Sequence, residues 1–137
     1  MPVIESLIRS EADGTISFGN YKLDTKSKLE NFEHAGDLYK VKTFREITKL
    51  ERNGMFVYES VPGTAVTNMA ASENGVEFEV EGPEDAEITL GLMEETEYDV
   101  FVAGKSIGQM KTNLGGKLTL SVELDPETPV AVKVSRV

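Results

Sequence analysis

The chain has 137 residues and a formal net charge of −10, with 14 lysine and arginine residues against 24 aspartate and glutamate residues. The length suits one domain that buries its own core, and the charge disfavours nucleic acid and anionic membranes, since both need a basic face to displace counterions. Without cysteine and with one histidine, disulfides, thiolate metal sites and multi-histidine metal sites are excluded, and we expect no metal or cofactor.

The N-terminal segment does not have the pattern of a secretion signal. Residues 1–9 contain no basic n-region and no continuous apolar stretch. No run approaches the roughly 18 apolar residues that a membrane helix requires. We therefore expect a cytoplasmic protein, although a chain from which a signal had been removed would give the same sequence.

Tight turns give the strongest local signals. The dipeptides Asp13-Gly14, Asn53-Gly54 and Asn74-Gly75 each separate two segments of alternating character. Such dipeptides accept the positive φ angles of a type I′ turn, whose twist suits a two-residue hairpin. The flanking strands are predicted at residues 3–11 and 15–23, 47–52 and 55–60, and 66–73 and 76–81.

The segment between the first two hairpins is predicted to form short strands at residues 29–33 and 38–43. Phe44, Ile47 and Leu50 are spaced by three, which is also compatible with a helical turn. Because Asn53-Gly54 follows, we expect a strand there.

The register of the third hairpin can be predicted from its turn. With Asn74-Gly75 at the centre, Ala71 lies opposite Phe78 and Met69 lies opposite Val80. Residues 76, 78 and 80 then share the core face, whereas residues 77, 79 and 81 point to solvent.

The C-terminal part continues with predicted strands at residues 86–92, 97–103, 106–112, 118–124 and 130–137. Seven strands from residue 64 onward are spaced as in a sandwich. We predict one all-β domain over residues 1–137, an antiparallel β-sandwich of about ten strands. Its N-terminal hairpin layer covers residues 1–61 and its C-terminal, Ig-like part covers residues 64–137, with a Pro-Gly turn at 61–64 as the boundary.

Part of this C-terminal pattern resembles a known class of domain. The matching residues are EYDVFVAG (97–104), Gly108, TNLGGKLTL (112–120) and VAVKV (130–134). They resemble the terminal strands of small Ig-like sandwich modules, which are often appended to carbohydrate-active enzymes and surface proteins. The whole chain also resembles a group of short bacterial all-β proteins, some of them named endosialidase. Known endosialidases are large trimeric phage tail enzymes, and no motif of theirs maps onto this sequence, so the resemblance implies no catalytic residue.

Two motifs resemble a catalytic motif and a calcium-binding motif but are better explained as turns. Residues 104–108 form a G-x-S-x-G, yet a strand is predicted after Ser106 and the only histidine, His34, lies upstream. Glu11, Asp13 and Gly14 match part of a calcium loop without its full set of ligands. We therefore assign no catalytic residue.

Charge segregation is the remaining functional signal. No lysine or arginine lies between residues 53 and 104, and this stretch holds twelve carboxylates, whereas the remainder has 14 basic and 12 acidic residues. The predicted register leaves the carboxylates of the third hairpin without a cross-strand cation. The candidate binding residues on this acidic face are Glu77, Glu79, Glu81, Glu84, Asp85 and Glu87.

Two interpretations of the acidic face remain open. It is either a solvated surface that aids solubility and blocks association, or a docking surface for Ca²⁺, a cationic protein partner or the lysine-rich half of a second copy in a homo-oligomer. The lysines of that half are Lys22, Lys26, Lys28, Lys40 and Lys42.

The function hypotheses follow from these observations. The first is a non-enzymatic structural or protein-interaction module. The second is a carbohydrate-binding or phage-tail-related accessory module, in which Tyr39, Phe44, Phe56 or Tyr58 would stack on sugar rings. The third is a glycan hydrolase that uses carboxylates or Ser106.

Overall fold

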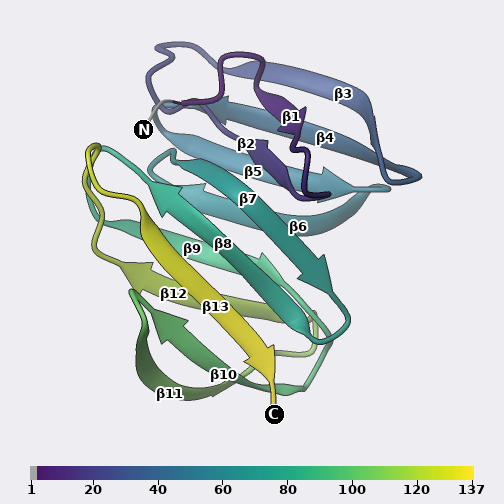
Figure 1. Ribbon diagram of the computed structural model, residues 1–137, viewed down its shortest axis with the longest axis vertical. Helices are drawn as coiled ribbons and strands as arrows, with labels where there is room; N and C mark the ends of the chain where they lie inside the picture. Colours follow the sequence, from purple (N-terminus) through teal and green to yellow (C-terminus); the bar gives the residue numbers. More distant parts are fainter. Residues whose placement is uncertain (1–2) are drawn as a thin grey trace.

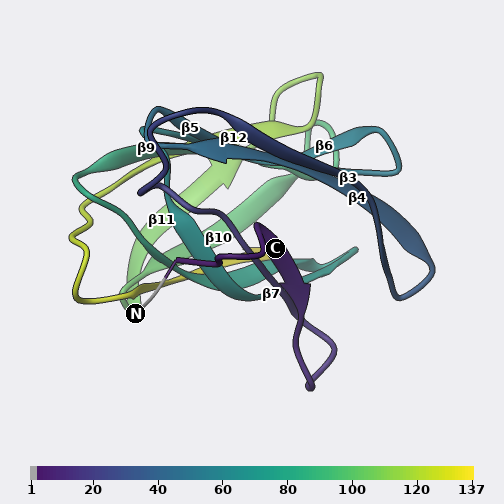
Figure 2. The same ribbon diagram turned by 90° about the horizontal axis from the view of Figure 1, so that it is seen from above.

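The computed structural model describes residues 3–137 and shows two antiparallel sheets, one of seven strands and one of six (Figure 1). Seen from above, the sheets form two layers packed face to face (Figure 2). The predicted all-β antiparallel sandwich is confirmed. It has thirteen strands in the described part rather than about ten, which equals the number of separate strand ranges predicted along the chain, and two of them are only three residues long. The first two residues of the expected domain lie outside the described range.

The sheets are built from hydrogen-bonded neighbours that are often distant in sequence. In spatial order, the seven-stranded sheet contains β1 (Ile8–Ser10), β2 (Ile16–Phe18), β7 (Ala65–Ser72), β8 (Gly75–Glu81), β13 (Val130–Arg136), β10 (Glu97–Val102) and β11 (Lys105–Lys111). The six-stranded sheet contains β12 (Lys117–Val122), β9 (Ala86–Gly91), β6 (Met55–Val61), β5 (Ile47–Arg52), β4 (Asp37–Phe44) and β3 (Ser27–His34). The boundary expected at residues 61–64 is a crossing from β6 in one sheet to β7 in the other, and both sheets contain strands from each side of it.

The core lies between the inward faces of the sheets and follows the period-2 alternation of the strands. Tyr58 of β6 is fully buried at its centre, and its ring contacts Phe18 and Phe78 edge-to-face at centroid distances of 5.2 and 5.7 Å. The Tyr58 hydroxyl is 2.7 Å from the Thr64 hydroxyl, which satisfies the polar end of the ring. Thr48 also bonds the backbone of Thr64 in both directions, so a hydrogen-bonded network fixes the crossing between the sheets.

The predicted register of the β7–β8 hairpin is wrong, although its core face is right. Ser72 pairs with Gly75 and Ala71 with Val76, so Glu73 and Asn74 are the central turn residues. Gly75 lies inside the strand because β13 passes close to it: a Cβ there would lie 1.9 Å from the Val134 carbonyl oxygen. A bulge between residues 67 and 70 shifts the register once more.

Candidate functional site

The six predicted acidic residues do not share one face. Glu77 and Glu79 lie on the outer face of the seven-stranded sheet, on β8. Glu87 is exposed on β9 of the six-stranded sheet, and Glu84 and Asp85 lie in the connection between these two strands. The Asp85 side chain accepts a hydrogen bond from the Leu124 N–H at 3.2 Å, so it also holds the end of β12 in place.

Glu81 is a correction to the predicted acidic face. Its side chain is only 2% exposed, and the Tyr21 hydroxyl donates to its Oε2 at 3.2 Å. Burial raises the pKa of Glu81, and burial of Tyr21, together with the Glu81 charge, raises the pKa of Tyr21 to about 12. The alternation that exposes residues 77 and 79 fails at residue 81 because Tyr21, from the segment after β2, lies against the end of β8. Glu81 is therefore unavailable to a docking partner.

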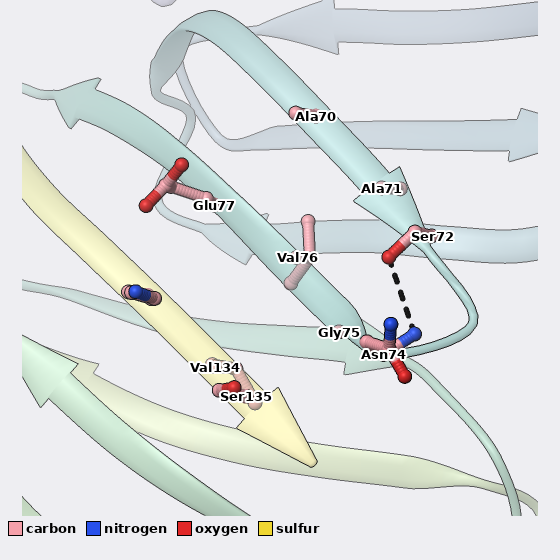
Figure 3. Close-up of a pocket in the computed structure, with 10 residues that line it drawn as sticks. Ala70, Ala71, Ser72, Asn74, Gly75, Val76, Glu77, Val134 and Ser135 are labelled. Atoms are coloured by element: carbon pink, nitrogen blue, oxygen red, sulfur yellow. Dashed lines mark hydrogen bonds between the residues drawn. The ribbon is translucent and has the colours of Figure 1, made fainter.

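The expected lack of a cross-strand cation is wrong for Glu77. Lys133 of β13 lies directly opposite it, on a strand that the sequence alone does not pair with β8. Glu79 lies opposite Thr67 and Ala131, so for this residue no cation is opposite. A hollow of about 270 Å³ lies beside this pair, lined mainly by small side chains and by the β7–β8 turn, where Ser72 accepts a hydrogen bond from the Asn74 N–H (Figure 3). The carboxylates of β8 therefore face an ordinary, partly neutralised surface.

The catalytic motifs take structural roles. Ser106 lies on the edge strand β11 and accepts a hydrogen bond from the Gly108 N–H at 3.3 Å. His34, at the end of β3, lies beside β1 at the other edge of that sheet, where its Nδ1 is 2.7 Å from the Ser10 hydroxyl and its Nε2 is 3.0 Å from the Gly14 carbonyl oxygen. Since a carbonyl can only accept, Nε2 carries a proton, and in the neutral imidazole Nδ1 then accepts from the Ser10 hydroxyl. His34 thus joins the β1–β2 hairpin to β3 and does not meet Ser106.

The calcium-like segment is a turn. Asp13 accepts hydrogen bonds from the backbone N–H and the hydroxyl of Thr15 at 3.0 and 2.6 Å, which lower the pKa of Asp13. Glu11 accepts from Ser17 and Arg9, and these bonds lower its pKa. Within residues 3–137, no three histidine or acidic side chains are grouped so that they could hold a metal ion.

The most unusual arrangement of charge lies on the outer face of the six-stranded sheet. Lys28 of β3 lies directly opposite Lys42 of β4, and Lys42 lies directly opposite Lys49 of β5. Like charges in directly opposed positions destabilise a sheet, because their side chains leave the same face about 5 Å apart. Lys40, two residues from Lys42 on the same face, adds a fourth ammonium group. We call Lys28, Lys40, Lys42 and Lys49 the lysine cluster.

The surroundings of Lys42 show the strength of this crowding. Its pKa is lowered first by partial burial and then by the neighbouring positive charges of Lys26, Lys49, Lys28 and Lys40. A hollow of about 70 Å³, open to solvent, lies within the cluster and is lined by Lys28, Lys40, Lys42, Lys49 and Glu51. In a chain with a net charge of −10, this is a local concentration of positive charge.

Two carboxylates accompany the lysine cluster: Glu51 of β5 lies within it, with its Oε2 3.7 Å from the Lys49 Nζ, and Glu59 of β6 lies beside it. Glu51 lies opposite Lys40, and Glu59 lies opposite Lys49. Beyond them, Phe56 lies on the same outer face, with the Lys117 ammonium 4.6 Å from its ring centroid. Phe56 does not share the buried face of Tyr58 two residues later, because the register shifts in the middle of β6 and turns Phe56 outward.

The sequence alone indicates most of these lysines only as a complement to the acidic stretch, and it does not single out Lys49. The available signal is spacing around one turn: Lys42 and Lys49 are symmetric about residues 45 and 46, where β4 turns into β5. Lys28 comes to lie opposite Lys42 only because the pairing shifts by one residue within β3.

The fold and this face define a β-sandwich module with a cationic patch on one sheet. Comparison with protein-family models, with curated proteins and with solved structures gave no match to this chain. Among residues 3–137 there is no helix long and apolar enough to span a membrane.

Proposed function

We propose that this chain is a non-enzymatic interaction module that binds an anionic partner through the lysine cluster. The observation that supports it is the row of three lysines in directly opposed positions on adjacent strands. Such a row costs folding free energy, and an anion bound above it would remove that cost. This proposal places the contact on the lysine cluster in preference to the candidate carboxylates, which lie on different faces.

The test is retention on an immobilised polyanion, with polyglutamate as the probe. We expect the wild-type chain to be retained at low salt and released as salt rises, since exposed charges are screened. Lys42→Gln/Lys49→Gln should elute earlier. The matched control, Lys105→Gln/Lys111→Gln, removes the same charge from β11 of the other sheet and should elute with the wild type. Equal elution of both double variants, or no retention of the wild type at low salt, would count against the proposal.

A carbohydrate-binding accessory module is the second candidate, and Phe56 is the observation that favours it. Its ring lies on the same outer face as the lysine cluster, and a Cβ at Gly91 would lie only 3.0 Å from its Cδ2. An outward aromatic ring beside hydroxyl and ammonium groups suits a sugar. Binding of a glycan that is lost in Phe56→Ala and kept in Lys42→Gln would favour this candidate over the first.

The Ig-like character of the C-terminal part is a proposal of the same kind. β9 and β12 are neighbours in one sheet, while β10 and β13 are neighbours in the other. This matches the pairing of strands B with E and C with F in Ig-like sandwiches.

The hydrolase hypothesis receives no support from Ser106 and His34, which lie at opposite edges of the seven-stranded sheet, on β11 and beside β1.

A further inference from the structure

The hollow inside the lysine cluster is small and open to solvent. Four lysines from β3, β4 and β5 line it, and its volume is about 70 Å³. Because the hollow is open, the charge of its lining restricts the ligand more than its volume does. A compact oxyanion seated there lies close to several ammonium groups at once.

The border of the cluster restricts the ligand further. Glu51 lines the hollow itself, and Glu59 lies opposite Lys49 on the next strand. A ligand whose negative charge extends beyond the cluster would meet both carboxylates, which weaken its binding. The favourable region for negative charge is therefore limited to three strands, a width of about 10 Å at the usual strand spacing.

We propose that the lysine cluster receives a single phosphate monoester carried by its partner. This inference rests on the proposed function and specifies the group recognised there. A phosphate monoester concentrates a charge of about −1.5 to −2 and three acceptor oxygens in one compact group. Lysine ammonium groups bind phosphate as point charges, and four of them around one hollow supply more donors than a carboxylate can use.

The experiment follows the lysine side-chain Hε–Cε signals by NMR while probes are added at constant ionic strength and near-neutral pH, where a phosphate monoester carries a charge of about −1.5 to −2. The probes are inorganic phosphate, a phosphoserine peptide, a sugar phosphate, and acetate as the carboxylate comparison. We expect the signals of Lys28, Lys40, Lys42 and Lys49 to move with the phosphate-bearing probes at much lower concentrations than with acetate. Lys42→Gln should lower the phosphate affinity about tenfold or more, because it removes a charge-assisted hydrogen bond.

The control variant is Lys105→Gln, which removes an exposed ammonium group from β11 and should leave the phosphate affinity unchanged. Preference between the phosphopeptide and the sugar phosphate identifies the source of the monoester. Equal responses to acetate and phosphate, or equal affinities for wild type and Lys42→Gln, would overturn this inference. Polyglutamate retention distinguishes the two failures: if it persists, the module still binds anions, and if it is absent, the proposed function fails as well.

Discussion

The outer faces of the two sheets surround their lysines differently: on the six-stranded sheet Lys40 and Lys49 lie opposite carboxylates, as lysines of the other sheet do, but Lys42 has a lysine opposite it on both sides. On the seven-stranded sheet, Lys133 lies opposite Glu77 and Lys111 lies opposite Glu97, so each cation meets a carboxylate across the strands. On the six-stranded sheet, Lys42 lies between Lys28 and Lys49. The first arrangement is what folding stability alone favours. The second opposes stability, and sites that oppose stability are where a function is expected.

The comparison depends on the register that brings Lys133 to Glu77, and Gly75 controls it. A Cβ at Gly75 would lie 1.9 Å from the Val134 carbonyl oxygen, and the residue has a φ of 140°. Gly75→Ala must therefore push β13 away from β8. We expect it to lower the free energy of unfolding by about 2 kcal/mol, measured by urea denaturation.

The control for this change is Gly104→Ala. Gly104 also has a positive φ, but nothing lies within 4 Å of its Cβ position. In this variant the free energy of unfolding should fall only by the cost of placing alanine in the left-handed conformation, about 1 kcal/mol. If both variants lose the same free energy, the close approach of β13 does not explain the glycine.

A second prediction reverses the charge at the centre of the lysine row. Lys42→Glu converts two like-charge pairs, with Lys28 and Lys49, into two opposite-charge pairs. We expect the free energy of unfolding to rise by about 1 kcal/mol, and the gain to shrink at high salt because the charges are screened. Urea denaturation at two salt concentrations measures both effects. A loss of stability would show that the three ammonium groups do not repel one another in the folded protein.

Most of the fold could be predicted because its signals are local. Period-2 alternation located the strands, and the Asn53-Gly54 dipeptide, whose residues both have positive φ, fixed the β5–β6 hairpin. The predicted hairpin register failed at Gly75, where glycine is required by the close approach of β13 and not by a turn. A single sequence does not show which strand will pass beside a glycine.

The site was harder to predict because it depends on register across three strands. The β3–β4 turn is Ala35-Gly36, and Ala35 takes a positive φ of 52° without a sequence signal for it. A bulge next to Asn31 shifts the pairing within β3. Counting charges along the chain therefore drew attention to the acidic stretch. The crowded charges in the folded protein are the lysines, because strands that lie side by side bring them together.

A third prediction creates a like-charge pair on the sheet that lacks one. Lys133→Glu would place a carboxylate directly opposite Glu77 on β8. We expect a loss of about 0.5 kcal/mol, since both side chains are exposed and their interaction is partly screened. Thermal denaturation compares this variant with Lys133→Gln, which removes the cation without adding repulsion and should lose less. Equal losses would mean that charge plays no part in this pair.

The smallest expected effect is the dependence of folding stability on pH that arises from Lys42. Because partial burial and four neighbouring lysines lower its pKa below the usual 10.5, the unfolded chain holds the Lys42 proton at pH values where the folded chain has begun to lose it. Stability linked to this group therefore rises with pH between the lowered pKa and 10.5. Lys42→Gln should be more stable than the wild type near neutral pH by a few tenths of a kcal/mol. This advantage should narrow as the pH approaches 10.5, since deprotonation relieves the same repulsion in the wild type. Urea denaturation of both proteins across this range measures the difference, and an advantage that stays constant with pH would assign it to a cause other than charge.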